Sequence, residues 1–304
     1  MVPNSAEAVA VLCAALDVEY QAIREHIPGP VAELEERGTL YEIAWLPTVH
    51  ATWKVVLVLT DRDNVPAAVQ VERAIAGFRP HVVLFVGVAG GRRDARIGDV
   101  VAASMIYDYE AGRDTDAGLL TRIKTMPSSF WLVQQAHAVV REERWIRRIK
   151  PAPPPVPPAA SVRPLAAGTK VVAGSASETA RLIDANCGDA QAVEMEGFGV
   201  LHAAHANKQV DALVIRGISD LLDGKDKLAD RSTQPAAARH AAAFAFELLH
   251  RLKPEMFPPH AERQTGAAGA VVQSGSGTMV ANTGVVHGDF VVGGPCHDGG
   301  QLAR

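Results

Sequence analysis

The sequence has few of the features that mark disulfide-linked, metal-binding or membrane proteins. Its 304 residues include only three cysteines, Cys13, Cys187 and Cys296, which are far apart and show no metal-ligand spacing. We therefore expect reduced thiols, no metal and no organic cofactor. No apolar run is long enough to span a bilayer, and the N-terminus lacks the pattern of a signal peptide. These absences predict a soluble, cytoplasmic protein with no membrane partner.

Charge of one sign is not concentrated anywhere along the chain. The formal net charge is −4, so a basic face that could follow a phosphate backbone is not expected, and nucleic acid is excluded as a predicted partner. Hydrophobic residues make up 48% of the chain and charged residues 21%. This composition is ordinary for a globular protein with a sizeable core.

Continuous apolar runs alternate with helical patterns along the chain. Residues 8–15, 55–59 and 82–86 are typical of strands buried on both faces of a sheet, and residues 66–75 predict a helix with Pro66 in its first turn. The same reading predicts further strands at 98–103, 169–174 and 211–217, and helices at 196–207 and 236–252. The pattern favours an α/β fold: a single three-layer domain with a central, mostly parallel or mixed sheet flanked by helices.

Two segments stand outside this alternation. Residues 150–160 are rich in proline and predict an extended surface loop, which is a spacer or a segment read by a proline-binding partner. After residue 257 the composition changes to glycine, serine and short valine pairs. We therefore predict a domain at 1–257 and a flexible, glycine-rich tail at 258–304.

Four segments, in chain order, carry a resemblance to a known family. They are Ala-Leu-Asp-Val-Glu-Tyr at 15–20, Val-Gly-Val-Ala-Gly-Gly at 86–91 followed by Ile-Gly-Asp-Val-Val at 97–101, Val-Glu-Met-Glu-Gly-Phe at 193–198, and Val-Ile-Arg-Gly-Ile-Ser-Asp at 214–220. They resemble the nucleoside phosphorylase superfamily, in particular its methylthioadenosine and S-adenosylhomocysteine nucleosidase branch. The resemblance covers roughly residues 8 to 252 and implies a phosphorylase-like fold.

The resemblance also implies roles for particular residues. Asp220 matches the acid that protonates the purine, Ser219 would orient it, and Glu19 matches the carboxylate that binds the attacking water. Glu196 would accept hydrogen bonds from both ribose hydroxyls, with Met195 against the sugar. The remaining predicted substrate-binding residues are Glu194, Ala89, Gly90 and Ser175.

Each acid also has a plain structural interpretation. Taken alone, Glu19 at the start of a helix complements the helix dipole, and Asp220 caps a helix. Taken together, each at a strand end and in family order, they predict a nucleosidase. Burial of Asp220 in an apolar pocket would favour its protonated form and let it donate a proton to the departing base.

Three departures from the family pattern bear on the reaction and the substrate. The chain has no Gly-Asp-Pro-x-x-Arg phosphate loop, which favours hydrolysis, although Arg92, Arg93 and Arg96 after the glycine turn keep phosphorolysis open. Residues 60–65 lack the glycine-containing turn of the nucleosidases. Residues 174–178 offer no aromatic side chain to stack on the base, so we expect a different base pocket.

The predicted function is therefore cleavage of the N-glycosidic bond of a purine, adenine-type nucleoside such as methylthioadenosine or S-adenosylhomocysteine. Two alternatives remain: a defence-type effector that depletes purine nucleotides, and a non-catalytic nucleoside sensor. The tail loosely resembles amyloid-signalling motifs and could bind a signalling partner, or it is simply disordered. The resemblance also implies a homodimer.

Overall fold

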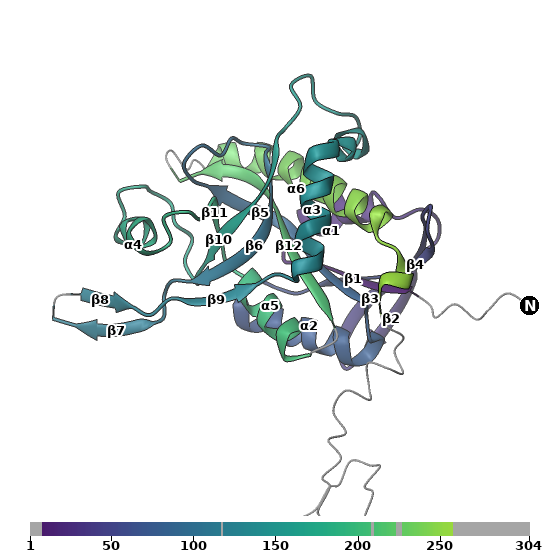
Figure 1. Ribbon diagram of the computed structural model, residues 1–304, viewed down its shortest axis with the longest axis horizontal. Helices are drawn as coiled ribbons and strands as arrows, with labels where there is room; N and C mark the ends of the chain where they lie inside the picture. Colours follow the sequence, from purple (N-terminus) through teal and green to yellow (C-terminus); the bar gives the residue numbers. More distant parts are fainter. Residues whose placement is uncertain (1–7, 117, 208–209, 223–226, 258–304) are drawn as a thin grey trace, which may run out of the picture. The chain divides into compact units, whose positions relative to one another are not determined.

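The computed structural model describes residues 8–116, 118–207, 210–222 and 227–257 (Figure 1). These residues form one compact unit that ends at Phe257, and the predicted tail lies outside them. The strands are β1 (Ala8–Ala14), β2 (Ala32–Glu36), β3 (Thr39–Pro47), β4 (Thr52–Leu59), β5 (Val82–Gly91), β6 (Val100–Asp108), β7 (Gly112–Thr115), β8 (Gly118–Thr121), β9 (Lys124–Pro127), β10 (Ala160–Ala167), β11 (Ala192–Glu194) and β12 (Asp211–Leu221).

In the described part of the chain, six α-helices connect and cover these strands. They are α1 (Asp17–Arg24), α2 (Asn64–Phe78), α3 (Phe130–Glu142), α4 (Glu178–Asn186), α5 (Gly197–Ala206) and α6 (Lys227–Arg251). Two short 3-10 helices occupy Arg144–Arg148 and Pro254–Met256. No helix among the described residues is long and apolar enough to cross a membrane.

A mixed ten-stranded sheet organises the described unit. Its strand order is β11-β10-β6-β12-β5-β1-β4-β3-β2, with β9 paired to β6. The pairs β1–β4, β1–β5, β5–β12, β6–β10 and β10–β11 are parallel. β11 also pairs with β5 in antiparallel fashion, so that β5, β12, β6, β10 and β11 close into a ring.

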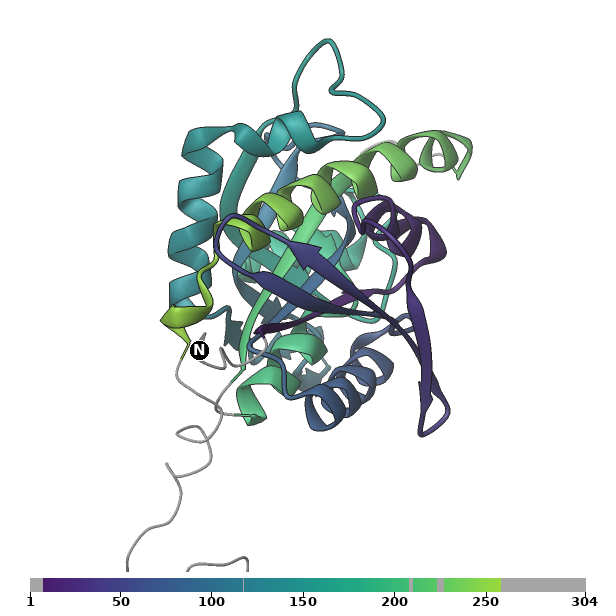
Figure 2. The same ribbon diagram turned by 90° about the vertical axis from the view of Figure 1, so that its right-hand side faces the viewer.

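Helices cover both faces of the sheet, which confirms the predicted three-layer α/β architecture (Figures 1 and 2). Alternate residues of β1 point to opposite faces: Ala10 and Leu12 pack with α1, α3 and α6, whereas Val11 and Cys13 pack with α2 and α5. β1 is buried along its whole length. A strand buried on both faces needs apolar residues at every position, as the sequence of this strand has.

One strand is not where the sequence predicted it. The expected strand at 169–174 has no regular structure, and the chain instead pairs with β6 nine residues earlier, through β10. Pro164 lies inside β10, where the register with β6 shifts, because proline cannot donate a ladder hydrogen bond. The β-branched pair Val171 and Val172 resembled a strand, but Val172 is buried in a loop beside a cavity.

The proline-rich segment agrees with its prediction. Residues 150–159 contain no helix or strand and are mostly exposed. The predicted helix at 236–252 also exists, but α6 begins earlier, at Lys227, and includes Pro235. Its extra turns bring Gln234 to the same edge of the sheet as the carboxyl ends of the central parallel strands.

Candidate active site

A cavity of about 360 Å³ lies at the carboxyl ends of the parallel strands. Open α/β sheets place their ligands at this edge. Eighteen residues line the cavity, and they include eight of the nine predicted site residues: Glu19, Ala89, Gly90, Glu194, Met195, Glu196, Ser219 and Asp220. Residues from segments about 200 positions apart in the chain therefore meet in one place.

Glu19 is held rigidly at the floor of this cavity. Its carboxylate accepts hydrogen bonds from the backbone N–H groups of Ala15 (2.9 Å), Leu16 (3.0 Å) and Val88 (2.7 Å). The bond to Leu16, at the start of α1, matches the structural interpretation of this residue, and the bond to Val88 ties it to β5. Burial raises the pKa of Glu19, while the nearby charge of Arg216 and these hydrogen bonds oppose that rise.

The buried guanidinium of Arg216 links two further carboxylates of the site, Glu194 and Glu196. Nη2 of Arg216 lies 2.6 Å from Oε2 of Glu194 and 3.4 Å from Oε2 of Glu196. Its guanidinium also lies 4.1 Å from the ring centroid of Phe85, a cation–π contact. We call Glu19, Glu194, Glu196 and Arg216 the charge cluster. It contains three carboxylates and one guanidinium.

Glu194 holds its neighbour in place. Its side chain has no exposed surface and accepts the backbone N–H groups of Glu196 and Gly197, in addition to its ion pair with Arg216. These contacts show that Glu194 positions the backbone of Glu196, and its predicted contact with substrate stays a prediction. Glu196 keeps 11% of its side chain exposed and lines the cavity.

The environment of Glu196 disfavours its charged form. Burial raises the pKa of this carboxyl to about 7, against the opposing effect of Arg216, and the carboxylates of Glu194 and Glu19 add to the rise. The backbone N–H of Asp63 donates to Oε1 at 3.4 Å. Glu196 is thus a carboxyl group that changes charge close to neutral pH.

A glycine allows the close approach within the charge cluster. A Cβ atom on Gly87 would lie 2.3 Å from Nη1 of Arg216 and 2.5 Å from Oε1 of Glu19, so any other residue there would displace these two charged groups. Gly87 in β5 therefore packs directly against both charged groups. The glycine-rich end of this strand serves the charge cluster as well as the cavity.

Ser219 and Asp220 reach the cavity through an irregularity in β12. The register between β12 and β5 shifts between Ile218 and Asp220, so one additional residue is accommodated at Ser219. Such a bulge redirects side chains that would otherwise alternate between the two faces. Both side chains are consequently buried at the cavity, and the Ser219 hydroxyl donates to Oδ1 of Asp220 at 2.7 Å.

The structure does not bring every predicted residue to the cavity. Ser175 is exposed in the turn before α4 and is not among the lining residues. Arg92 is buried elsewhere, where it donates to the backbone oxygens of Cys187 (3.2 Å) and Ala190 (2.7 Å) and pairs with Asp184. Arg96 pairs with Asp99, and neither Arg93 nor Arg96 lines the cavity.

Sequence reasoning missed three contributors. Arg216 lies in the quoted Ser-Asp segment, and its position inside an otherwise apolar strand was a usable signal for a buried ion pair. Arg62 lines the cavity from the loop after β4, a segment noted only for its departure from the family pattern. Gln234 carried no signal, because it precedes the predicted helix at 236–252 and belongs to no motif of the sequence.

Comparisons with known proteins agree with this geometry. The family model described as the phosphorylase superfamily matches residues 8–253. A 5′-methylthioadenosine/S-adenosylhomocysteine nucleosidase of Actinobacillus succinogenes is 26% identical over 202 residues, which cover 66% of this chain and 82% of that protein. A death domain-containing ATP nucleosidase of Amphimedon queenslandica is 27% identical over 210 residues, 63% of this chain but only 37% of that protein.

A solved structure shares the fold. The 5′-methylthioadenosine/S-adenosylhomocysteine nucleosidase of Helicobacter pylori superposes with a TM-score of 0.67 at 21% identity, covering 81% of this chain and 99% of that one. The superposition therefore extends over nearly all of the described residues. Since the family model also spans most of the sequence, the chain belongs to the phosphorylase superfamily.

Proposed function

We propose that this protein hydrolyses the N-glycosidic bond of a purine nucleoside or a derivative of one, with adenine as the departing base. The observation that carries the proposal is the meeting of Glu19, Glu196 and the Ser219–Asp220 pair around one cavity. The nucleosidases among the relatives and structural neighbours support N-glycosidic hydrolysis in general. We call Ser219 and Asp220 the base end of the cavity, and Glu19, Met195 and Glu196 its sugar end.

At the base end, Asp220 donates a proton to N7 of the purine as the bond from C1′ to N9 breaks. The electron pair of that bond passes to the base, so protonation neutralises the charge that develops on it. The Ser219 hydroxyl, 2.7 Å from Oδ1, holds the carboxyl group in a fixed orientation. Ala89 and Gly90, at the end of β5, form the adjoining wall.

At the sugar end, the ribosyl group becomes cationic while the base departs. The charge cluster has two more negative groups than positive ones when all its members are ionised, so its field stabilises positive charge above it. Glu196 accepts hydrogen bonds from the 2′ and 3′ hydroxyls. Glu19 holds a water whose oxygen attacks C1′ and whose proton Glu19 accepts, which yields free base and a ribosyl sugar.

The distribution of arginines supports water as the nucleophile. Phosphorolysis requires an anion site beneath C1′, and the three arginines that kept it open, Arg92, Arg93 and Arg96, do not line the cavity. The cations that do line it, Arg62 and Lys170, come from other segments of the chain. Beside the predicted water position lie the carboxylates of Glu19 and Glu196. Two carboxylates there would repel phosphate and accept hydrogen bonds from water.

A chromatographic assay of adenine release tests the proposal. Purified full-length protein is offered adenosine, methylthioadenosine, S-adenosylhomocysteine, AMP and ATP, each with and without phosphate. We expect release that does not depend on phosphate and that is lost in Asp220→Asn. Release that requires phosphate would make the enzyme a phosphorylase, and no release from any substrate would favour a nucleoside sensor.

A second candidate function is an effector that depletes purine nucleotides when its tail assembles. It is favoured by the ATP nucleosidase among the relatives, which carries a further domain, and by the glycine- and valine-rich composition of residues 258–304. Those residues lie outside the described part of the structure, so this candidate depends on sequence alone. If the isolated tail peptide forms no thioflavin-binding fibrils under varied conditions, the assembly idea fails. The homodimer likewise stays a prediction.

A further inference from the structure

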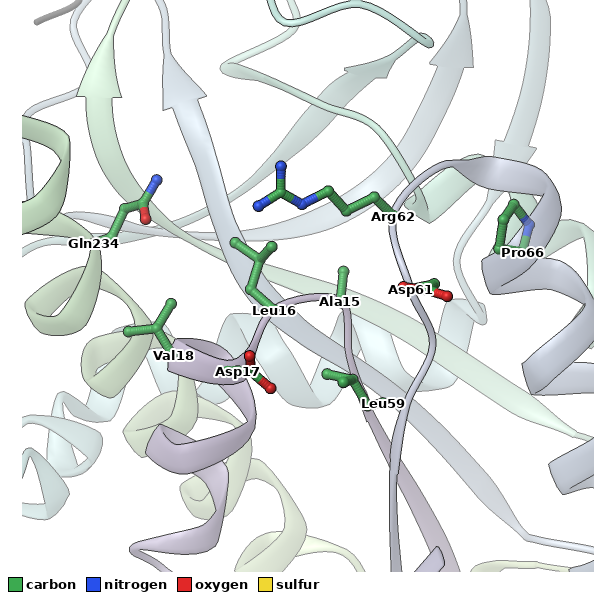
Figure 3. Close-up of a pocket in the computed structure, with 9 residues that line it drawn as sticks. All are labelled: Ala15, Leu16, Asp17, Val18, Leu59, Asp61, Arg62, Pro66 and Gln234. Atoms are coloured by element: carbon green, nitrogen blue, oxygen red, sulfur yellow. The ribbon is translucent and has the colours of Figure 1, made fainter. Parts of the chain in front are cut away.

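A second cavity adjoins the catalytic one. It has a volume of about 550 Å³ and is lined by Ala15, Leu16, Asp17, Val18, Leu59, Asp61, Arg62, Pro66 and Gln234 (Figure 3). We call it the outer cavity. Four of its residues, Ala15, Leu16, Arg62 and Gln234, also line the catalytic cavity. The two cavities therefore meet along these four residues.

The outer cavity lies where the 5′ substituent of a bound nucleoside would go. With the base at Asp220 and the ribose hydroxyls at Glu196, the 5′ carbon points away from the base end. Leu16, Arg62 and Gln234 line both the catalytic cavity and the outer cavity. A substituent longer than a hydroxyl would pass these three residues into the outer cavity.

Arg62 is held at the junction by an unusual loop. Asp61 and Asp63, on either side of it, both have positive φ values, of 67° and 79°. The backbone of Asp63, with ψ at 152°, occupies a region that is nearly restricted to glycine. The N–H of Asp63 donates to Glu196, so the same turn contacts the predicted ribose ligand and positions Arg62.

The guanidinium of Arg62 is available for a ligand. It forms no ion pair with any residue in the described part of the chain. Figure 3 shows it extended above Leu16 towards the side-chain amide of Gln234. The carboxyl groups of Asp17 and Asp61 point away from it, so the half of the outer cavity next to the catalytic cavity has a cation and an amide.

We propose that Arg62, with Gln234, binds an oxyanion carried by the 5′ substituent, so that the enzyme prefers nucleosides with a phosphate or carboxylate at that end over neutral ones. This inference rests on the proposed function. A guanidinium is suited to either anion because its planar N–H groups match two oxygens at once. Asp17 and Asp61 oppose a large anion farther out and confine it to the side near Arg62.

Steady-state kinetics of adenine release with the full-length protein test this assignment. The substrates are adenosine and methylthioadenosine as neutral arms, AMP and ATP as phosphate arms, and S-adenosylhomocysteine as the carboxylate arm. In Arg62→Gln we expect kcat/KM for the preferred anionic arm to fall by about 10- to 100-fold, the value of a charge-assisted hydrogen bond. The neutral arms should change by less than about twofold, and the arm that responds identifies the anion.

Matched variants separate charge from packing. Arg62→Lys should keep part of the preference, and Asp61→Asn should raise kcat/KM for the anionic arm by about two- to fivefold because one repulsive charge is removed. Arg113→Gln, an exposed arginine of the β7–β8 hairpin, should change nothing. Equal effects of Arg62→Gln on all arms, or none on any, would overturn the inference.

A binding measurement keeps this inference distinct from the proposed function. If no substrate is cleaved, the proposed function fails, and calorimetry with AMP and adenosine then decides the role of Arg62. Tighter binding of AMP than of adenosine that is lost in Arg62→Gln supports the anion site. Equal binding of the two ligands, or no binding of either, would overturn it.

Discussion

The two ends of the cavity are held in place by different means. At the sugar end, three backbone N–H groups fix Glu19, and Glu196 belongs to the buried charge cluster around Arg216. At the base end, Asp220 is oriented by the Ser219 hydroxyl and by the register shift in β12. In the proposed mechanism, the sugar end therefore contains groups that act on the substrate and also belong to the buried core. The base end depends on a local bend of one strand. A substitution at the base end should change the rate, and one in the charge cluster should change the free energy of unfolding as well.

The largest expected effect on rate is at the base end. Asp220→Asn removes the proton donor while keeping the shape, and kcat should fall by about 10²- to 10⁴-fold. The thermal unfolding midpoint should stay close to that of the natural protein. The matched control is Asp114→Asn on the exposed β7 strand. Retained activity in Asp220→Asn would remove the acid from the mechanism and erase the contrast between the two ends.

The largest expected effect on stability is in the charge cluster. Arg216→Met leaves Glu194 and Glu196 buried without their cation, and breaking such a pair costs about 3–5 kcal/mol. Urea unfolding at pH 8 measures this loss, with Arg113→Met as the exposed control. The loss should be smaller at pH 6, where Glu196 is protonated in the folded state. A stability equal to that of the natural protein would show that the cluster does not stabilise the fold.

The third prediction concerns pH. Since the pKa of Glu196 is raised to about 7, the free enzyme loses this charge as pH falls below that value. A protonated carboxyl accepts ribose hydroxyls less well, so kcat/KM should fall about tenfold between pH 8 and pH 6. The profile of Glu196→Gln should be low and flat over the same range. An unchanged acid limb in that variant would assign it to another group.

The smallest expected effect is at Ser219. Ser219→Ala removes one hydrogen bond to Asp220, and kcat should fall by about 3- to 10-fold. KM should change little, because the hydroxyl orients the acid and does not bind the sugar. Ser161→Ala, near the start of β10, is the control. A change in KM alone would mean that Ser219 contacts the substrate directly.

Much of the fold follows from local sequence. β1, β4, β5 and β12 were predicted because apolar, β-branched runs of that length have few alternatives to a buried strand. β10 was misplaced because Val171 and Val172 resembled a strand, whereas the strand that forms contains Pro164, which is tolerated there at a register shift. The pairing of β11 with β5, which closes the ring, depends on contacts distant in the chain and has no local signature.

The site residues also divide into those with a local sequence signature and those that only the folded structure reveals. Glu19, Glu196 and Asp220 were identified by the motifs around them, and the structure brings them to one cavity. The sequence could not show that the arginines after the glycine turn lie away from the cavity. Arg92 has the sequence position of a phosphate ligand, but in the structure its guanidinium binds Ala190 and Asp184. Arg62 was not predicted as a site residue, yet it lines the cavity. A charged residue in a loop gives no local sign that it faces a cavity.

By itself, the sequence determined which strands are buried and which acidic residues end or follow them, because burial and strand ends are local properties of apolar runs and their flanking residues. Only the tertiary structure decided which charges share an environment. Glu196 has a pKa near 7 because the chain buries it beside Glu194, Glu19 and Arg216, which the folded sheet brings together. Desolvation and Coulomb interactions act through space, so no spacing along the chain could specify them.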